Sequence, residues 1–211
     1  MKTTIEINNS KYELDLSKPL DISMRLSTEP NNSSAWYVDP ISIDPVQGEG
    51  FIGSVAQGGS VNFRNITFNP HGNGTHTETV GHIDKKIHSI NKYLKTFHFL
   101  GQVISVTPST WNKTNGTRNV GDFIITKEQL KGAIGNNKPE ALILRTLPND
   151  SAKLSKQYSN TNPPYLCHEA AQFLKEMGVN HLLIDLPSVD KEVDGGELLS
   201  HKAFWNYPED I

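Results

Sequence analysis

Apolar and polar residues alternate along several stretches of the chain, and alternation with a period of two predicts half-buried strands. Residues 3–16 alternate in this way and are expected to form one strand or a pair of strands. The stretch SVNFRNITF, residues 60–68, alternates more loosely and should lead a strand into the polar segment that follows. Further strands are predicted at residues 102–106 and, as a continuous apolar run of the buried type, at residues 141–147.

Helix signals lie in the second half of the chain. Thr126 and Gln129 have the spacing of a capping box, which predicts a short helix to about Ile134 with Gly135 just past its end. The stretch CHEAAQFLKEMG predicts a second helix, since its apolar residues have helical spacing: Ala170, Phe173, Leu174 and Met177. Gly178 is expected to end this helix. The apolar strand VNHLLIDLPSVD follows directly. Strands therefore dominate, with a few late helices, and this order indicates a layered fold of the α/β or α+β class.

The Pro- and Ser-rich residues 19–45 predict loops around short extended pieces, and the glycine-rich residues 48–59 predict turns. Residues 87–97 are expected to be helical or irregular. No internal repeat or low-complexity linker divides the 211 residues, so we expect a single domain over residues 1–211.

Charge and composition narrow the classes of partner. The net charge of -3 gives no basic excess of the kind that binds nucleic acid or anionic membranes. The first residues do not resemble a secretory leader, and no stretch approaches the ~20 apolar residues that span a bilayer. Cys167 is the single cysteine, which excludes an intrachain disulfide and fits a reducing compartment. We therefore expect a soluble, cytoplasmic protein with no nucleic-acid or membrane partner.

The stretch NPHGNGTHTETVGH, residues 69–82, concentrates three of the eight histidines and one acid. Strand alternation would send His76 and Glu78 to the same face, about 7 Å apart along the chain. Residues 72–74, Gly-Asn-Gly, allow a reversal with positive φ that returns His71 to the same place. Imidazole and carboxylate together suit zinc, manganese or iron. A structural zinc site usually contains cysteine, so a catalytic site with open coordination positions is favoured over a polar loop. His82, four residues beyond Glu78, could exchange protons beside such an ion.

HGNGTHTETVGH resembles the motif H-x-G-T-H-x-D-x-P-x-H of the cyclase family of metal-dependent hydrolases, a family that includes kynurenine formamidase. Other elements of that family have counterparts in the same order. They are LDLSKPLD near Leu14, LILRTLPND near Leu142, YLCHEAAQFLKEMGVNHLLIDLPSVD, and ELLSHKAF around His201. The order of these pieces, from about Leu14 to His201, is the specific part of the resemblance.

This resemblance implies a swivelling β/β/α fold, strand-rich with few helices, and a homo-oligomer that is a dimer or tetramer. It implies one or two divalent ions, with zinc the first choice and manganese the second. Carried over residue by residue, it makes His82 the catalytic acid/base, Trp36 a substrate-binding wall, and the metal ligands His71, His76, Glu78 and His201. The implied reaction is hydrolysis of a small amide, an N-formyl arylamine or a cyclic amide, by attack of metal-bound hydroxide.

Three departures from the family pattern stand out. One additional residue separates His71 from His76, and Glu78 replaces the usual aspartate without the proline that normally follows. The family also places a glutamate ligand roughly a dozen residues or more beyond the position of His201, where only Glu209 and Asp210 are available here. Either the chain is truncated, or one of these acids substitutes, or the site holds one ion. We favour truncation, because a terminal strand of the family also has no counterpart.

Two other functional classes fit part of the pattern. Two histidines and a carboxylate, here His76, Glu78 and His201, also hold iron in non-haem oxygenases, although His71 and His82 would then have no role. A noncatalytic or degenerate metal-binding member of the family is the other alternative, given the departures. Asp185 and Asp190 are expected to cap the end of a strand and the following turn rather than to bind metal.

Overall fold

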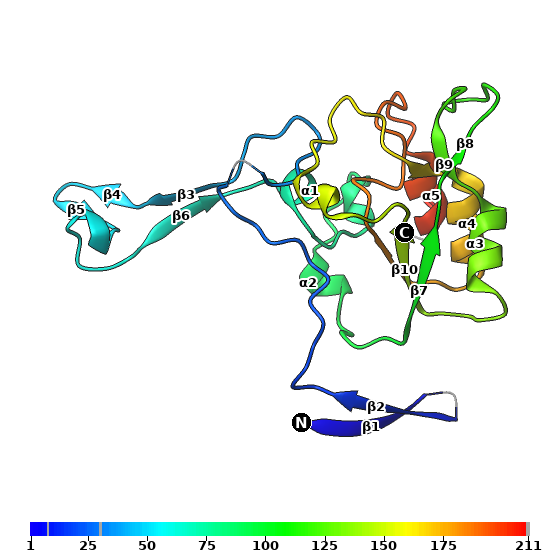
Figure 1. Ribbon diagram of the computed structural model, residues 1–211, viewed down its shortest axis with the longest axis horizontal. Coiled ribbons are helices and arrows are strands. Elements are labelled where there is room, and N and C mark those ends of the chain that lie inside the picture. The colour runs from blue at the N-terminus through cyan, green and yellow to red at the C-terminus, as the bar shows by residue number, and fades with distance from the viewer. Residues whose placement is uncertain (8, 30, 210–211) are drawn as a thin grey trace.

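A parallel three-stranded sheet with strand order β12-β10-β7 forms the centre of the protein body in the computed structural model, which describes residues 1–7, 9–29 and 31–209. Its strands are β7 (Gly101–Val106), β10 (Ala141–Thr146) and β12 (His181–Ile184). Leu142 and Leu144 of β10 are almost completely buried on the face that packs against helices. The helices on this face are α3 (Lys127–Ile134) and α4 (His168–Glu176), as Figure 1 shows.

The core between sheet and helices is built from aliphatic side chains. Helix α3 contributes Leu130 and Ile134, and α4 contributes Ala170 and Leu174, all of them at most 2 % exposed. Burying one leucine or isoleucine side chain stabilises the fold by about 1.5–3 kcal/mol, so this cluster holds the sheet and both helices together.

Both predicted helices are confirmed, with their ends. The Thr126 hydroxyl accepts a hydrogen bond from the Gln129 N–H, and the Gln129 side chain accepts one from the Thr126 N–H, which completes the capping box. Gly135 (φ 66°) and Gly178 (φ 85°) follow the two helices in the left-handed region, where glycine carries no steric penalty.

A second, smaller sheet and a further helix extend the body. Its strand order is β11-β9-β8, from β8 (Ser109–Thr110), β9 (Phe123–Ile125) and β11 (Tyr165–Leu166). Helix α5 (Leu199–Trp205) packs against α4. The sequence patterns did not predict β9 or α5. Among the described residues, no helix is long and apolar enough to cross a membrane.

Two antiparallel ribbons project from the body (Figure 1). The N-terminal ribbon, residues 2–15, pairs β1 (Lys2–Ile7) with β2 (Ser10–Asp15), as the sequence predicts. The arm, residues 42–68, pairs β3 (Ser42–Pro45) with β6 (Arg64–Thr67). Its tip contains β4 (Gln47–Gly48), β5 (Phe51–Ile52) and a 3-10 turn, Val55–Gln57. The strand predicted over residues 60–68 is therefore confined to its second half.

Short helical pieces connect these parts. The longer connection from arm to body contains α1 (Pro70–Asn73), a 3-10 turn at Val80–His82 and α2 (Ile90–Tyr93), and another 3-10 turn spans Ser151–Ser155. The observed combination of sheets covered by helices confirms the predicted layered α+β class, strand-rich with few helices.

A buried ion pair ties the two halves of the body together. Asp122, immediately before β9, accepts hydrogen bonds from the Tyr165 hydroxyl (2.7 Å), the Asn162 amide (2.9 Å) and the Asn119 N–H (2.8 Å). The Lys191 ammonium lies 2.8 Å from the same carboxylate, and both side chains are at least 93 % buried. Burial alone would raise the pKa of Asp122, but the Asn119 N–H and Lys191 outweigh it and lower that pKa from 3.8 to about 2.

We expect Asp122→Asn to lower the free energy of unfolding at neutral pH by roughly 3–5 kcal/mol, because Lys191 would remain buried without its counter-charge. The folded-state pKa of Asp122 lies below its unfolded value, so the stabilisation is fully present above pH 3.8 and is lost as the pH falls through about 2. Urea unfolding of both proteins should therefore show a difference that shrinks over this range. A constant difference would contradict the assignment.

Candidate metal centre

One turn of helix places His71 at the base of the arm. The Asn69 side chain caps this turn by accepting hydrogen bonds from the N–H groups of His71 (3.0 Å) and Gly72 (3.2 Å), and Pro70 begins α1. A Cβ on Gly72 would lie 2.5 Å from the side chain of Val38, so only glycine permits this close approach.

The predicted reversal through residues 72–74 with positive φ is wrong. Gly72 and Asn73 lie in the helical turn, and Gly74 has an extended φ of 175°. The additional residue between His71 and His76 is therefore accommodated next to a turn of helix rather than in a left-handed bulge.

His76 and Glu78 lie in an extended loop and not in the predicted strand, since residues 75–79 pair with no strand in the part of the chain that the structure describes. Their side chains nevertheless face the same side, with 3.7 Å between His76 Nε2 and Glu78 Oε2. Nδ1 of His76 lies 3.0 Å from the carbonyl oxygen of Gly74, which holds the ring with Nε2 directed toward the carboxylate.

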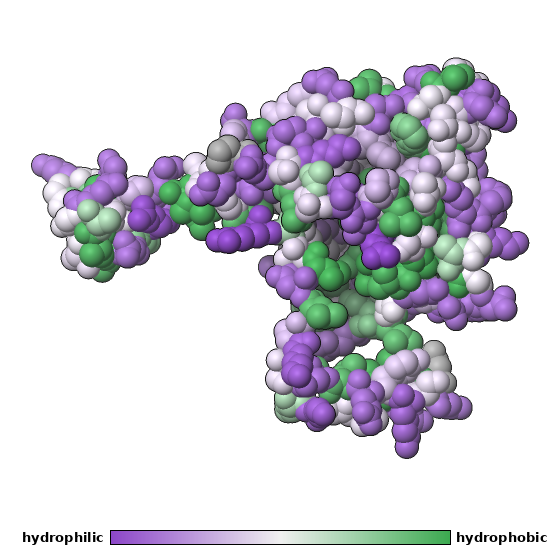
Figure 2. Space-filling view, in the orientation of Figure 1, coloured by the Kyte–Doolittle hydropathy of each residue, from purple (hydrophilic) through white to green (hydrophobic). Residues whose placement is uncertain are grey.

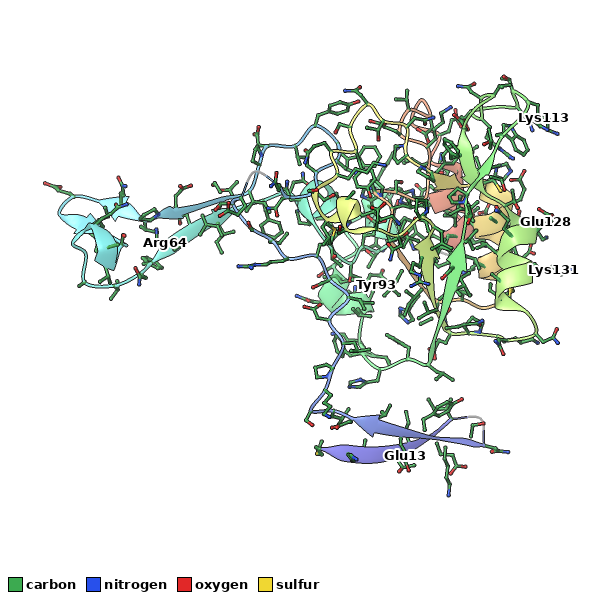
Figure 3. The ribbon with its side chains drawn as sticks, viewed as in Figure 1. Glu13, Arg64, Tyr93, Lys113, Glu128 and Lys131 are labelled. Carbon is green, nitrogen blue, oxygen red and sulfur yellow. The ribbon has the colours of Figure 1, made fainter. Side chains whose placement is uncertain are left out.

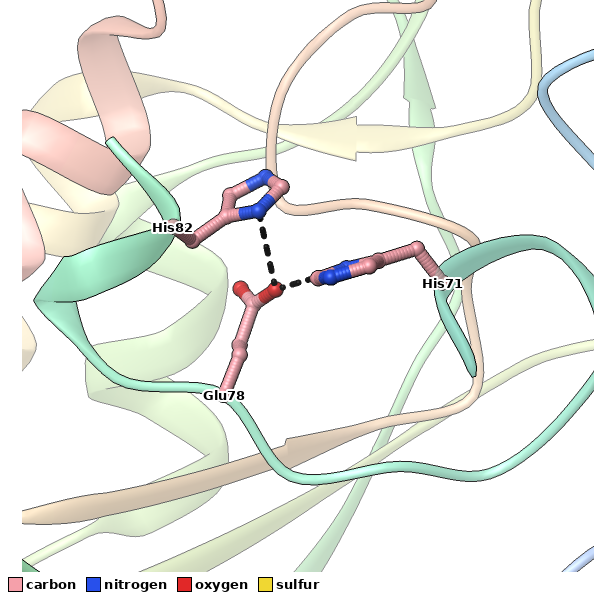
Figure 4. A group of neighbouring side chains, drawn as sticks. All are labelled: His71, Glu78 and His82. Atoms are coloured by element: carbon pink, nitrogen blue, oxygen red, sulfur yellow. Dashed lines mark ion pairs between the residues drawn. The ribbon is translucent and has the colours of Figure 1, made fainter. Parts of the chain in front are cut away.

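The Glu78 carboxylate is the centre of the cluster. His71 Nδ1 and His82 Nδ1 lie 3.2 and 3.7 Å from Glu78 Oε2, as the dashed lines in Figure 4 show. On its other oxygen, His201 Nε2 lies 3.2 Å from Oε1. The rings of His71 and His82 stack with centroids 4.5 Å apart. The structure thus brings together all five residues that the sequence nominated for metal binding and proton transfer.

His201 reaches the cluster from α5 and is held by Asp190. Nδ1 of His201 lies 2.6 Å from Asp190 Oδ2, and both side chains are more than 90 % buried. The same carboxylate accepts hydrogen bonds from the backbone N–H groups of Ser200 (2.6 Å) and His201 (3.1 Å). Asp190 therefore caps the first turn of α5 and orients His201. The sequence analysis placed Asp190 in a local cap, because no spacing pattern links it to a helix that begins nine residues later.

Charge and burial act in opposite directions on the groups of the cluster. Burial alone would raise the pKa of Glu78, but hydrogen bonds from His201 and His76 outweigh it and hold that pKa well below its ordinary range. Burial alone would lower the pKa of His201, but Asp190 and Glu78 raise it to about 9. The pKa of His82 is lowered, chiefly by burial, so this imidazole is neutral at pH 7.

This donor set fits a divalent metal ion. His71, Glu78 and His82 each offer a ligand atom, and these atoms all lie within 4.8 Å of one another. His76 and His201 each have one ring nitrogen held by an oxygen, a feature typical of metal-binding histidines, and direct the other toward Glu78. Imidazole nitrogen and carboxylate oxygen suit zinc and its neighbours in the first transition row. By distance to Glu78 alone, His76 and His82 are equivalent.

Trp36 lies on a segment that contacts the helical turn of His71. The Ala35 N–H donates a hydrogen bond to the Gly72 carbonyl oxygen (2.9 Å). Trp36 and Tyr37 both adopt left-handed backbone conformations, with φ of 61° and 57°. Two consecutive non-glycine residues in this region are strained, and such strain is concentrated at functional sites. Of the two late acids, Glu209 is exposed and Asp210 lies outside the described residues.

The sequence matches the family described as "Putative cyclase" over residues 14–191, and the chain therefore belongs to this cyclase family. Its curated relatives include proteins named kynurenine formamidase. The one from Bacillus anthracis is 30 % identical over 195 residues, which are 90 % of this chain and 78 % of that protein. The one from Bacillus cereus is 28 % identical over 92 % of this chain and 77 % of that protein. The one from Bacillus cytotoxicus is 28 % identical over 72 % of this chain. The matched part is 63 % of that relative, so this chain spans less than two thirds of the relative's length.

We expect Asp190→Asn to weaken zinc binding roughly 10- to 100-fold, because the outer partner of a metal-binding histidine fixes its orientation and tautomer. Competition with a chromophoric chelator measures this affinity directly. Asp194→Asn is the matched control, since Asp194 lies in the same loop and accepts hydrogen bonds from Gly196 and Leu198. Equal losses in both variants would show that Asp190 has no specific role in orienting His201.

Proposed function

We propose that this protein is a metal-dependent hydrolase that cleaves the C–N bond of a small amide, either an N-formyl arylamine or a cyclic amide. The observation that carries the proposal is the Glu78 carboxylate surrounded by four imidazoles from two separate segments of the chain. Membership of the cyclase family and similarity to proteins named kynurenine formamidase support the substrate class.

In this proposal His71, His76, Glu78 and His201 are the metal ligands, with zinc the first choice, manganese the second, and one or two ions in the site. The fixed outer nitrogens of His76 and His201 support their assignment as ligands. An oxygenase centre built from only two histidines and one acid would leave two of the four imidazoles at Glu78 without a role, which favours the hydrolase.

A bound divalent ion would supply Lewis-acid chemistry by lowering the pKa of a water molecule toward ~7 and polarising the carbonyl of the substrate. The protein itself must then move protons between the attacking water and the leaving nitrogen. His82 is assigned this role because its imidazole is neutral at pH 7 and can accept a proton. Its side chain is 33 % exposed, so it remains accessible to a substrate. General acid–base catalysis of this kind contributes about 10²- to 10⁴-fold in rate.

Trp36 is proposed to form an aromatic wall of the substrate site. Its neighbour Ala35 donates a hydrogen bond to the Gly72 carbonyl oxygen, in the turn that carries His71. Trp36 therefore lies one residue away from a contact with this turn. A flat indole would favour an aryl group on the substrate by stacking and by burial of apolar surface.

We further propose that the protein is a single-domain homo-oligomer, a dimer or tetramer, in the cytoplasm. The net charge of -3 gives no basic excess of the kind that binds nucleic acid. Cys167 is a buried free thiol, consistent with a reducing compartment.

Hydrolysis of N-formylkynurenine is the direct test. We expect the pure protein to contain a transition metal by elemental analysis and to release formate from this substrate. Removal of the metal with a chelator should abolish turnover, and addition of Zn²⁺ or Mn²⁺ should restore it. Full activity in the metal-free protein would overturn the proposal, whereas bound metal without hydrolysis of N-formyl or cyclic amides would identify a noncatalytic member of the family.

The substitutions His76→Ala and His82→Ala test which of the two histidines binds metal and which transfers protons, since both imidazoles lie 3.7 Å from Glu78. We expect His76→Ala to lose metal and activity together. His82→Ala should retain the metal and lose about 10²- to 10⁴-fold in kcat. Metal content by elemental analysis and kcat by formate release distinguish the two. If His82→Ala lost the metal as completely as His76→Ala, His82 would be a ligand instead.

A further inference from the structure

The 3-10 turn that carries His82 is joined to a residue further along the chain. The Thr79 carbonyl oxygen accepts a hydrogen bond from the His82 N–H (2.9 Å), and the Thr79 hydroxyl accepts one from the Gly81 N–H (3.3 Å). The same hydroxyl donates a hydrogen bond to the carbonyl oxygen of His88 (2.9 Å). The residue that begins the turn therefore also contacts a position six residues beyond His82.

Gly81 packs directly against His88. A Cβ on Gly81 would lie 3.0 Å from the Cβ of His88 and 3.1 Å from its backbone nitrogen. These distances are shorter than the separation of about 3.5–4.0 Å at which non-bonded atoms attract each other. Glycine at position 81 thus permits the two segments to touch, and His88 contacts the backbone one residue before His82.

The imidazole of His88 is fixed at both of its nitrogens. Nε2 lies 2.5 Å from Asp84 Oδ2, and Nδ1 lies 2.8 Å from the hydroxyl oxygen of Tyr93. A ring that donates from Nε2 to the carboxylate and accepts at Nδ1 from the hydroxyl satisfies both contacts. The hydrogen bond from His88 lowers the pKa of Asp84, which keeps this partner ionised at neutral pH. Neither nitrogen of His88 is left for a metal ion or a substrate.

The Asp84–His88 contact is enclosed, although the segment around it lies near the surface. None of residues 79–93, all of which the structure describes, is fully buried. Ile87 is 96 % exposed, and Figure 2 shows hydrophobic residues at the surface around α2, where Figure 3 labels Tyr93. The side chains of His88 and Asp84, by contrast, are only 6 % and 11 % exposed. A hydrogen bond shielded from water in this way is stronger than an exposed one and restricts the segment.

A further hydrogen bond links the same carboxylate to the helix that carries His201. Tyr207, two residues past the end of α5, donates from its hydroxyl to Asp84 Oδ1 (3.4 Å). Its N–H donates to the Lys202 carbonyl oxygen (2.9 Å), which fixes Tyr207 to the helix. The rings of His82 and His201 lie with centroids 5.3 Å apart. Asp84 thus joins the segment of His82 to α5 by a contact that does not involve Glu78.

We propose that Asp84 and His88 are positioning residues, which hold the turn of His82 so that its imidazole faces Glu78 and the substrate. The polar atoms of the pair are engaged with each other and with Tyr93 and Tyr207, so both residues act through His82 rather than on the substrate. This inference rests on the proposed function, which gives His82 its role in proton transfer. Displacement of a catalytic group by about 1 Å can cost roughly 10²-fold in rate.

Hydrolysis of N-formylkynurenine by the metal-loaded full chain tests the inference with two substitutions at one position. His88→Phe keeps an aromatic ring but removes both nitrogens, whereas His88→Gln keeps an N–H group that can donate to Asp84. We expect His88→Phe to lower kcat roughly 10- to 100-fold with KM and metal content near the wild-type values, because the chemical step alone is affected. His88→Gln should recover most of this loss. His98→Phe, at an exposed histidine ten residues further along, is the matched control and should retain wild-type kcat.

Asp84→Leu removes the same hydrogen bond from the other partner. The double variant with His88→Phe should be no slower than Asp84→Leu alone, because both substitutions act through one contact. Circular dichroism establishes that each variant is folded, and Asp84→Leu takes the place of His88→Phe if the latter does not fold. A folded variant with wild-type kcat would overturn the inference. Loss of metal together with activity, or a His88→Gln protein as slow as His88→Phe, would overturn it as well.

Amide hydrogen exchange over residues 79–84 requires no substrate and separates this inference from the proposed function. Exchange should be faster in His88→Phe than in the wild type, and close to the wild-type rate in His88→Gln. A wild type that shows this pattern without cleaving N-formylkynurenine would contradict the proposed function alone. Unchanged exchange in His88→Phe, with an active wild type, would contradict the positioning role alone.

Discussion

A partly buried carboxylate needs counter-charge or hydrogen-bond donors, and at Glu78 this need is met by imidazoles. Only 27 % of the Glu78 side chain is exposed, yet its pKa is held below the ordinary range because His201 and His76 donate to it. His71 and His82 complete the ring around the same group. The base of the arm, the extended loop at residues 75–79 and the first turn of α5 therefore converge on this carboxylate, and the histidines that they carry favour its ionised form.

The position of α5 is fixed in turn by a chain of buried charges. Asp190 holds His201 and the first turn of the helix, while the adjacent Lys191 is paired with Asp122 at the start of β9. Two neighbouring residues thus connect the candidate centre to the second sheet. The net stability gained from such buried pairs is small, because desolvation offsets much of their Coulombic attraction, but removal of one partner leaves the other charge buried without compensation.

Local sequence signals were sufficient where one short segment determines its own structure. The capping box at Thr126 and the stop at Gly178 define the ends of both long helices. They failed where distant packing decides, as at Gly72, whose glycine is required by contact with Val38 rather than by positive φ. The candidate ligands His71, His76 and Glu78 and the candidate acid/base His82 share one segment, but His201 was found only through the family resemblance. For Asp190 the sequence predicted only a local cap, because its partners Ser200 and His201 belong to a separate element.

The histidines around Glu78 differ in their contact with solvent. His201 is 8 % exposed and rests against Asp190, whereas His71 is 41 % exposed at the base of the arm. The centre is consequently buried on the side of His201 and exposed to solvent on the side of His71. His71 and His82, 41 % and 33 % exposed, are therefore the imidazoles of the cluster that bulk water reaches most readily, whereas Asp190 and the first turn of α5 shield His201 from it.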